Sequence, residues 1–310
     1  MEKRRLYLAV EEWLTDYKRN SVKTLTYDRL LISYKMMLKY SIAEIRVDEI
    51  GTRDMQRYLN ALVADGYSMS TIKKQFNLIT AYWKWAMAQG LIVTPVYMGV
   101  NLPSETAIKS HKTDIQVYSP TEQRRLLRKL MTLEHDQYAA VVLMLEAGLR
   151  IGEVLALEWT DILWNRRALR IHRTLIRMSS EATTYVQESP KSKTSKRTIP
   201  LSDRALEILD KLLERRGISQ GLIFARLDDP NLPYSYSSVE FHVRRLCKDL
   251  DISYRGLHAF RHTFATNCYE RGCDVKILSK LLGHADVSIT YNTYIHLYGD
   301  ALEEMRKVIG

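Results

Sequence analysis

The sequence GLHAFRHTFATN (residues 256–267) places His258, Arg261 and His262 within one short helical segment whose other residues are mostly apolar or small. Three interpretations fit such a group of two imidazoles and a guanidinium. The residues could bind a metal ion, could face a phosphate group, or could be polar residues on an ordinary surface. The rest of the chain distinguishes between these interpretations.

The metal interpretation depends on His258 and His262, which are four residues apart and therefore share a helix face, as a pair of zinc ligands does. Ala259 stands where the helix of a metalloprotease carries its general-base glutamate. Arg261, between the two histidines, would repel a cation. We therefore expect no metal ion and no other cofactor, and His262 has no assigned role.

The phosphate interpretation depends on His258 and Arg261, which are three residues apart and leave the same helix face. An imidazole can donate one hydrogen bond to a phosphate oxygen, and a guanidinium can donate two in a fixed geometry. Such a pair alone is more often structural, so this interpretation needs support from other parts of the chain.

The composition of the chain indicates a polyanionic partner. The 310 residues carry a formal net charge of +10 with a pI of about 9.3, and both halves of the chain share the basic excess. This favours nucleic acid over an acidic membrane surface. No run reaches the ~18 apolar residues of a membrane span. Glu11 and Glu12 interrupt any signal-peptide core, and the three cysteines lack zinc-type spacing, so we expect a cytoplasmic protein.

The apolar pattern predicts two domains joined by a linker. Residues 1–103 contain helical patterns only and predict a small DNA-binding bundle. Residues 104–118 are polar and aperiodic, which is typical of a linker. Residues 119–310 mix helical and strand patterns and predict a catalytic domain, with a short tail helix that starts after Asp300.

Capping residues predict where several helices begin. Thr52 is the expected N-cap of the helix in TRDMQRYLNALVADG, and Ser70 is the expected N-cap of the next helix. Ser119 and Glu122 form a capping box at the start of the second domain, with Pro120 as the first helical residue.

The middle of the second domain predicts β structure. ALRIHRTLI (residues 168–176) has the character of a strand, and TYVQESPKSKTSKRTIPL (residues 184–201) predicts a hairpin. The basic residues in the middle of this hairpin are Lys191, Lys193, Lys196 and Arg197.

Further motifs place reactive residues next to glycines. In GLRIGE, Gly148 breaks an apolar helix, and Arg150 follows just before another helix start, where backbone N–H groups and a guanidinium can face an anion. In LLGHADVS, Gly283 ends a helix and His284 follows. NTYIH then contains Tyr294.

In this order and spacing, GLRIGE, the basic hairpin, HAFRHTFAT, LGHADVS and NTYIH resemble the tyrosine recombinases, or phage-integrase family. The resemblance covers about residues 119–297 by motif, and the helical front of the chain is similar to that family's core-binding domain. It implies a mostly α fold with a small β-sheet or hairpin, made of a helical, SAM-like core-binding domain and a mixed α+β catalytic domain. A start directly in the core-binding pattern resembles Xer-type recombinases or mobile-element integrases without an arm-binding domain.

The resemblance also implies roles for particular residues. Arg150 and Arg261 correspond to the paired arginines that hold the scissile phosphate, and His258 corresponds to the histidine of the HxxR motif. His284 corresponds to the histidine or tryptophan after LG. Glu153 corresponds to the acidic residue three positions after the first arginine, where it orients other groups.

The nucleophile and the proton donor to the leaving group follow from the same resemblance. Tyr294 corresponds to the nucleophile, with Tyr291 and Tyr298 as competing candidates. Lys191 corresponds to the hairpin lysine that protonates the leaving 5′-oxygen, with Lys193 as the alternative, because hairpin length varies in this family.

The expected activity is site-specific DNA recombination through a 3′-phosphotyrosine intermediate, which integrates, excises or resolves DNA. The expected partners are double-stranded DNA recombination sites, further copies of the chain in a tetramer on DNA, and an accessory directionality factor, with no membrane. Two alternatives remain. A type IB topoisomerase-like enzyme would relax DNA with the same chemistry, and a catalytically silent protein would only bind DNA.

Overall fold

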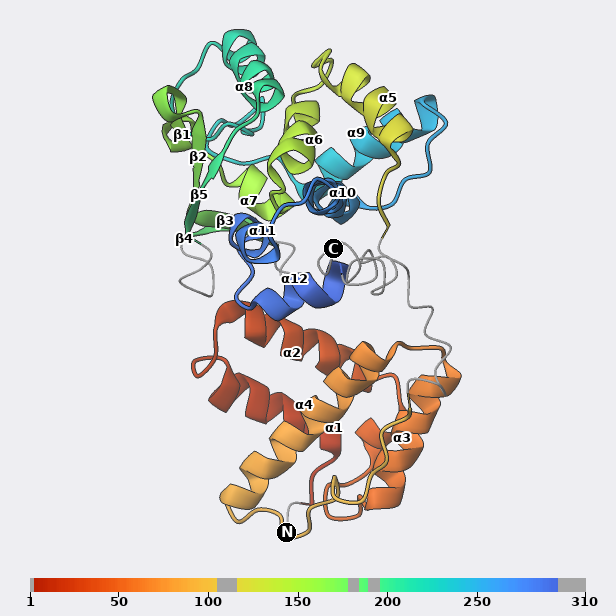
Figure 1. The fold of residues 1–310 in the computed structure, drawn as a ribbon. Helices are drawn as coiled ribbons and strands as arrows, with labels where there is room; N and C mark the ends of the chain where they lie inside the picture. Colours follow the sequence, from red (N-terminus) through yellow and green to blue (C-terminus); the bar gives the residue numbers. More distant parts are fainter. Residues whose placement is uncertain (1–2, 105–115, 178–183, 189–195, 295–310) are drawn as a thin grey trace, which may run out of the picture. The chain divides into compact units, whose positions relative to one another are not determined.

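The computed structural model describes residues 3–104, 116–177, 184–188 and 196–294 (Figure 1). The chain divides into two compact units, and the boundary between them falls near residue 113. Each unit has its own hydrophobic core. The predicted fold class, mostly α with a small sheet, is confirmed.

The first unit is built from helices. They are α1 (Leu6–Glu12), which continues as a π-helical segment (Trp13–Lys18), α2 (Thr24–Met37), a 3₁₀ turn (Ser41–Glu44), α3 (Thr52–Ala64) and α4 (Met69–Ala88). On α3, the predicted apolar stripe is buried, and its residues are Met55, Tyr58, Leu59 and Leu62. Burial of this stripe fixes which face of α3 points into the core.

Two predicted N-caps of this unit were wrong by one or two positions. Gly51, not Thr52, precedes α3, because the carboxylate of Asp54 accepts a hydrogen bond from the backbone nitrogen of Gly51 at 3.0 Å. Ser68, not Ser70, caps α4, because its hydroxyl accepts a backbone hydrogen bond from the first turn at 3.3 Å. Both helices nevertheless lie where the sequence predicts them.

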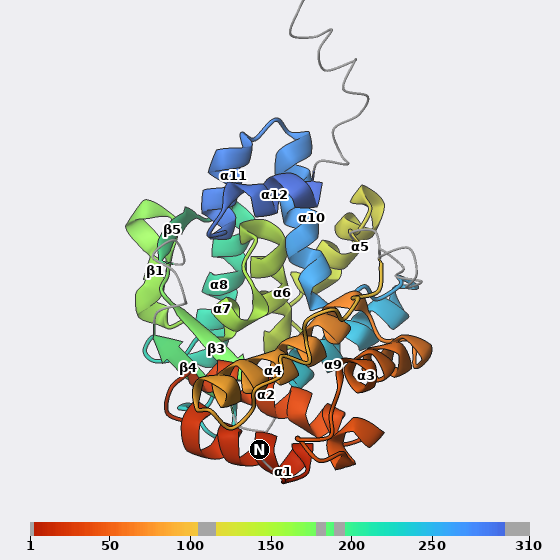
Figure 2. The ribbon, with the colours of Figure 1, turned by 90° about the horizontal axis from the view of Figure 1, so that it is seen from below.

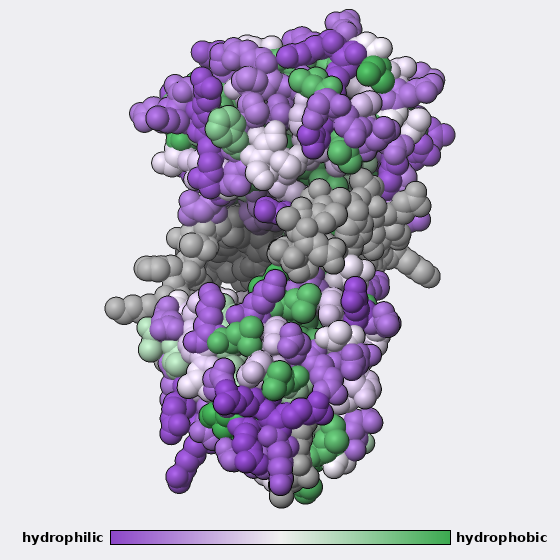
Figure 3. Space-filling view, turned by 180° about the vertical axis from the view of Figure 1, so that it is seen from behind, coloured by the Kyte–Doolittle hydropathy of each residue, from purple (hydrophilic) through white to green (hydrophobic). Residues whose placement is uncertain are grey.

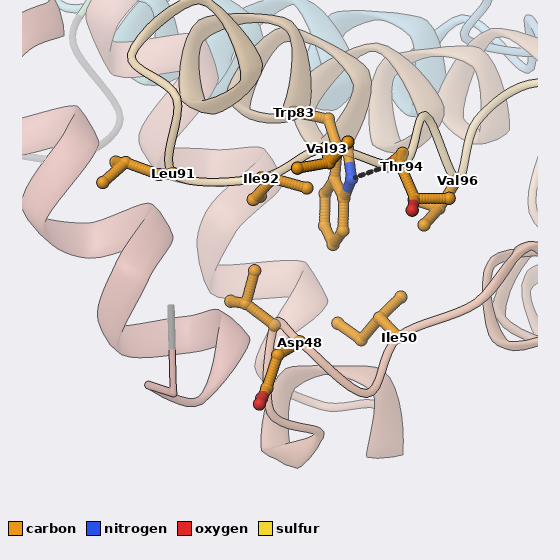
Figure 4. A pocket seen from close by; sticks show the side chains of 9 residues that line it. Asp48, Ile50, Trp83, Leu91, Ile92, Val93, Thr94 and Val96 are labelled. Atoms are coloured by element: carbon orange, nitrogen blue, oxygen red, sulfur yellow. Dashed lines mark hydrogen bonds between the residues drawn. The ribbon is translucent and has the colours of Figure 1, made fainter. Parts of the chain in front are cut away.

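Aromatic side chains fill the centre of the first unit. Trp13, Tyr82 and Trp83 are fully buried, and the ring of Tyr82 meets those of Trp13 and Trp83 edge to face, with centroids 5.9 and 5.7 Å apart. The indole of Trp83 also borders an apolar cavity of about 120 Å³ (Figure 4). Its Nε1 donates to the carbonyl oxygen of Thr94 at 3.0 Å, so the ring contributes both packing and a hydrogen bond.

The second unit surrounds the buried helix α6 (Asp136–Ala147). Nearly every residue of α6 is buried, and the helix packs against α8 (Asp203–Arg216), α9 (Tyr236–Asp249) and α10 (Leu257–Glu270) (Figures 1 and 2). A helix that is apolar on all sides suits this central position. The other helices of the unit are α5 (Pro120–Leu130), α7 (Ile151–Leu155), α11 (Val275–Leu282) and α12 (Val287–Tyr294), with 3₁₀ turns at Trp159–Asp161 and Trp164–Arg166.

The strands form two small sheets. One sheet has the antiparallel order β1 (Ile162–Leu163), β2 (Ala168–Ile171) and β5 (Arg197–Pro200), and the other pairs β3 (Arg173–Arg177) with β4 (Thr184–Glu188). The predicted hairpin of residues 184–201 was therefore wrong in its pairing, since β4 and β5 belong to different sheets. Leu169 lies opposite Ile199, and both are buried in the core, which accounts for the pairing of β5 with β2. The predicted strand over residues 168–176 is interrupted at His172.

The predicted capping box at the start of α5 is confirmed. The backbone nitrogen of Ser119 donates to the Glu122 carboxylate at 2.7 Å, the Ser119 hydroxyl accepts from the backbone nitrogen of Glu122 at 3.3 Å, and Pro120 is the first residue of α5. In Figure 3, the visible surface of both units is largely hydrophilic. Among the described residues, no helix is long and apolar enough to cross a membrane.

Trp83 provides a test of the core of the first unit. Trp83→Ala should lower the free energy of unfolding by about 3–5 kcal/mol, because it leaves a cavity and removes the donor to Thr94. Urea denaturation of the full chain, followed by circular dichroism, measures this change. Trp83→Phe keeps most of the packing and should lose less. Equal stability of the Ala variant and the wild type would contradict this description of the core.

Candidate active site

The turn between α6 and α7 positions the first candidate arginine. Gly148 ends α6 with a positive φ of 64°, and Arg150 is the N-cap of α7. A Cβ atom at Gly148 would lie 2.3 Å from Cδ1 of Phe264 on α10, so only glycine lets the two helices approach this closely. The predicted helix break at Gly148 is confirmed.

Glu153, on α7, is the buried acid at the centre of the site. Its side chain is 4% exposed. It accepts hydrogen bonds from the backbone nitrogen and Nη1 of Arg150, both at 2.9 Å, and from Nη1 and Nη2 of Arg197 at 3.0 and 2.9 Å. Nη1 of Arg261 lies 3.9 Å from its Oε2.

The charge of Glu153 depends on these neighbours. Burial raises the pKa of a carboxyl group, but the hydrogen bonds and charge of Arg197, and then the charges of Arg150 and Arg261, lower the pKa of Glu153 to about 2. The carboxylate is therefore ionised at neutral pH, and one negative charge lies among three positive ones.

The same three guanidinium groups also bind the carboxyl end of α11. The carbonyl oxygen of Leu281 accepts from Nε of Arg197 at 2.7 Å, and the next carbonyl accepts from Nη2 of Arg261 at 2.6 Å. The carbonyl of Gly283 makes a longer contact of 3.5 Å with Nη2 of Arg150. A helix leaves its last carbonyls without intrahelical partners, and cations suit this negative end of the helix dipole.

The two predicted phosphate-binding arginines differ in their exposure. The side chain of Arg150 is 37% exposed, whereas that of Arg261 is 3% exposed. Nη1 of Arg261 also donates to the carbonyl of Gly148 at 2.7 Å, which fixes the plane of this guanidinium against the end of α6. In this arrangement an incoming anion reaches Arg150 first.

His284 connects the arginines to α12. Nη2 of Arg261 donates to Nε2 of His284 at 3.1 Å, which assigns the ring proton to Nδ1, and Nδ1 then donates to Oγ1 of Thr290 at 2.7 Å. Burial, followed by the charges of Arg261, Arg150 and Arg197, lowers the pKa of His284 to about 4. The ring is therefore neutral at pH 7.

His258 lies in the first turn of α10, with its ring perpendicular to that of His262 and 4.6 Å from it between centroids. Partial burial, followed by His262, Arg261 and Arg150, lowers the pKa of His258 to about 4, although the residue keeps an exposed edge. The pKa of His262 is also lowered, by burial and by Arg261. Within the described part of the chain, no three His, Cys, Asp or Glu residues are grouped to hold a metal ion.

Several candidate residues lie outside this description. Lys191 and its alternative Lys193 fall in a range that the structure does not describe, and so does Tyr298. Tyr294 is the last residue of α12, and its side chain is not described. Tyr291, the remaining tyrosine candidate, is 45% exposed on the same helix.

Arg197 is the site residue that sequence reasoning missed. The motifs single out Arg150, Glu153, Arg261 and His284, and the structure brings these four together. Arg197 counts in the sequence only as one basic residue of the predicted hairpin. The signal that could have found it is its place in RTIPL, directly before the strand that enters the core.

Comparison with known proteins gives the class of this fold and site, an enzyme that cleaves and rejoins DNA. The family model described as "Phage integrase family" matches residues 116–300, and that described as "Phage integrase, N-terminal SAM-like domain" matches residues 10–90. The first match covers more than half of the chain, so the chain belongs to the phage integrase family. It is a tyrosine recombinase, and its activity is site-specific DNA recombination.

Similar sequences come from several kinds of genetic element. A XerC-like tyrosine recombinase of Caldanaerobacter subterraneus subsp. tengcongensis is 28% identical over 92% of this chain and 77% of the relative. The integrase of Staphylococcus phage L54a is 25% identical over 94% of this chain and 88% of its own length. The transposase of transposon Tn916 from Enterococcus faecalis is 24% identical, with 87% and 71% covered. Nothing in these matches favours a topoisomerase or a silent DNA-binding protein.

Two solved structures are similar in fold. The Tn1549 transposon integrase in complex with transposon right end DNA has a TM-score of 0.79 at 19% identity, covering 99% of this chain and 100% of the other. A lambda integrase tetramer bound to a Holliday junction has a TM-score of 0.66 at 18% identity, covering 94% and 77%. At such identities the likeness supports the fold alone.

The lowered histidine pKa values can be tested by titration. His284 should stay neutral down to about pH 4 in the folded protein, whereas an unfolded histidine protonates near its ordinary value of 6.5. The folded state then binds fewer protons, so this group lowers stability as the pH falls from about 6.5 to 4. Histidine NMR titration measures the pKa, with the signal assigned by its loss in His284→Gln. A titration of this signal near 6.5 would contradict the described contacts.

Proposed function

We propose that the chain cleaves and rejoins double-stranded DNA at recombination sites through a covalent 3′-phosphotyrosine intermediate, with Tyr294 as the nucleophile. One observation carries this proposal. Buried Glu153 binds Arg150 and lies 3.9 Å from Arg261, next to two histidines that are neutral at pH 7. Such a site presents fixed positive charge to a phosphate group.

The proposed reaction replaces one phosphodiester bond by another of similar energy. The Tyr294 oxygen forms a bond to the scissile phosphorus, the tyrosine proton passes to a base, and the bond from phosphorus to the 5′-oxygen breaks. The 5′-oxygen takes up a proton and leaves as a hydroxyl group. Attack by the 5′-hydroxyl of a partner strand reverses these steps and releases the tyrosine, so strand exchange consumes neither ATP nor a cofactor.

Arg150 and Arg261 would stabilise the charge that this attack creates. A tyrosine with a pKa near ~10 is only about 0.1% ionised at neutral pH, so it needs assistance at phosphorus as well as proton removal. Negative charge grows on the non-bridging oxygens as the bond forms. One fixed hydrogen-bond donor at such a position is typically worth ~10²–10³ in rate. Glu153 would orient both arginines without reacting itself.

His258 and His284 would act from their neutral forms. Neutral His258 can accept the proton of the tyrosine hydroxyl. Nη2 of Arg261 donates a hydrogen bond to Nε2 of His284, and a bound phosphate oxygen could accept this hydrogen bond instead. The phosphate would then bring a negative charge next to the imidazole ring. This charge raises the pKa of His284, so the ring gains a proton at Nε2 and donates it in a hydrogen bond to the phosphate.

The larger assembly follows from the two units. We assign DNA binding to residues 1–103, a linker to residues 104–118 and catalysis to residues 119–310, whose predicted tail helix after Asp300 lies outside the described residues. The net charge of +10 supports contact with duplex DNA. The tetrameric lambda integrase supports a tetramer on DNA for this chain as well. An accessory factor would set the direction of recombination, and the cysteine content suits the cytoplasm.

The nucleophile can be tested directly. Tyr294→Phe should abolish the covalent protein–DNA adduct, because it removes the attacking oxygen, and should change half-site affinity little, because it removes no charge. A suicide substrate with a nick next to the scissile phosphate traps the adduct for gel analysis. Tyr291→Phe, on the same helix, is the matched control and should keep the adduct. An adduct with the Tyr294 variant would assign the nucleophile elsewhere.

The lysine can be tested through the leaving group. Lys191→Ala should slow cleavage of normal DNA, and a 5′-bridging sulfur substrate should restore much of the rate, since a thiolate leaves without taking up a proton. Single-turnover cleavage of both substrates measures this rescue. Lys193→Ala is the control and should show no rescue. Rescue of the Lys193 variant in place of the Lys191 variant would assign proton donation to Lys193.

A further inference from the structure

Arg197 is a buried arginine that binds two separate parts of the proposed site. It is the first residue of β5, and its side chain is 7% exposed. Nη1 and Nη2 donate in parallel to the two oxygens of Glu153 at 3.0 and 2.9 Å, and Nε donates to the carbonyl of Leu281 at 2.7 Å. A planar guanidinium in this geometry fixes both position and orientation of its partners.

These contacts join three parts of the chain that are distant in sequence. Through Glu153, Arg197 reaches α7 and the carboxylate that binds Arg150. Through Leu281, it reaches the end of α11, directly before His284. The fit is close, because a Cβ atom at Gly283 would lie 2.7 Å from Nη1 of Arg197. Glycine at this position is therefore what admits the guanidinium.

We propose that Arg197 is a positioning residue for the recombination reaction. It holds the Glu153 carboxylate in the orientation in which that carboxylate fixes Arg150, and it holds the turn that carries His284. This inference rests on the proposed function, since it takes Arg150 as a residue that stabilises the phosphate. Arg197 itself contacts no substrate, because its guanidinium is occupied by Glu153 and Leu281.

Glu153 alone does not fix its own orientation. Arg150 donates to it from its backbone nitrogen and from a side chain that is 37% exposed, and Arg261 lies 3.9 Å away, whereas Arg197 contacts both oxygens from β5 with a guanidinium that is itself buried. Without Arg197 the carboxylate keeps its hydrogen bonds from Arg150 but loses those from β5, so the carboxylate and the side chain of Arg150 can shift together. A misplacement of a catalytic group by about 1 Å can slow a reaction roughly 10²-fold.

The test compares Arg197→Lys with the wild type. Lysine keeps the positive charge but is a point donor and cannot make the parallel contact. Single-turnover formation of the covalent adduct should fall roughly 10²-fold. Half-site affinity in a gel shift should change less than threefold, because the net charge is kept and the residue is buried. Arg204→Lys is the matched control, since Arg204 forms an exposed ion pair with Glu146 at 3.1 Å on the same unit, and it should cleave at the wild-type rate.

A substrate with a methylphosphonate at the scissile position separates positioning from a general structural defect. This group lacks one charged oxygen, so its cleavage depends less on Arg150. If Arg197 acts through Arg150, the defect of Arg197→Lys should shrink at least tenfold on this substrate, and Arg150→Ala should behave in the same way. An equal defect on both substrates would overturn the inference.

A second variant is needed if thermal melting shows that Arg197→Lys is poorly folded. In Arg197→Met, an apolar side chain replaces the guanidinium, and Glu153 keeps its hydrogen bonds from Arg150, so the carboxylate is not left buried without a partner. This variant should melt like the wild type. Its cleavage rate should still fall more on the phosphodiester than on the methylphosphonate substrate. If the wild type is active and a folded Arg197 variant cleaves at the same rate, the inference is overturned but the proposed function is not. A wild type without any adduct overturns the proposed function and the inference with it.

Discussion

The ionised carboxylate of Glu153 is the constraint on which the candidate site depends. Three guanidinium groups cannot share a small, largely buried volume without compensation, since two like charges about 4 Å apart repel by roughly 4 kcal/mol at an effective dielectric constant of ~20. Glu153 supplies one negative charge among them, and the last carbonyls of α11 supply the negative end of a helix dipole. Both are fixed by the backbone. The arginines are therefore oriented before any phosphate arrives, and the site keeps a net positive charge.

The architecture of the second unit follows from the need to bring four distant segments to this carboxylate. The buried helix α6 determines where Gly148 turns the chain, and the close approach of α6 and α10 determines where Arg261 lies. The pairing of β5 with β2 carries Arg197 to the same point from another direction. Small residues at two turns, Gly148 and Gly283, make these approaches possible. A packed core and a buried ion-pair network thus support each other.

The sequence predicts those parts of the fold and of the candidate site that are determined by residues close together in the chain. The start of α5 was predicted correctly, because Ser119, Pro120 and Glu122 act within one turn. Arg150 and Arg261 could also be singled out because they lie inside motifs, and both lie next to Glu153 in the structure. The partner of β5 was not, since strand pairing is decided by burial of residues such as Ile199 against distant neighbours. The contacts of Arg197 have the same non-local origin, which is why a basic residue in a polar-looking segment gave no sign of burial.

The neutral histidines follow from the same charge balance. With three arginines and one carboxylate nearby, a further proton on His258 or His284 would add to an existing excess of positive charge, and both pKa values are lowered accordingly. An arriving phosphodiester reverses this situation, because its negative charge offsets the arginines and favours a protonated imidazole. The donor capacity of His284 is then greatest when the substrate is bound and least when the site is empty. His284 also contacts Thr290 on α12, the helix that ends at Tyr294. In the proposed reaction, phosphate binding at His284 would therefore be coupled to the helix of the proposed nucleophile through this one imidazole ring.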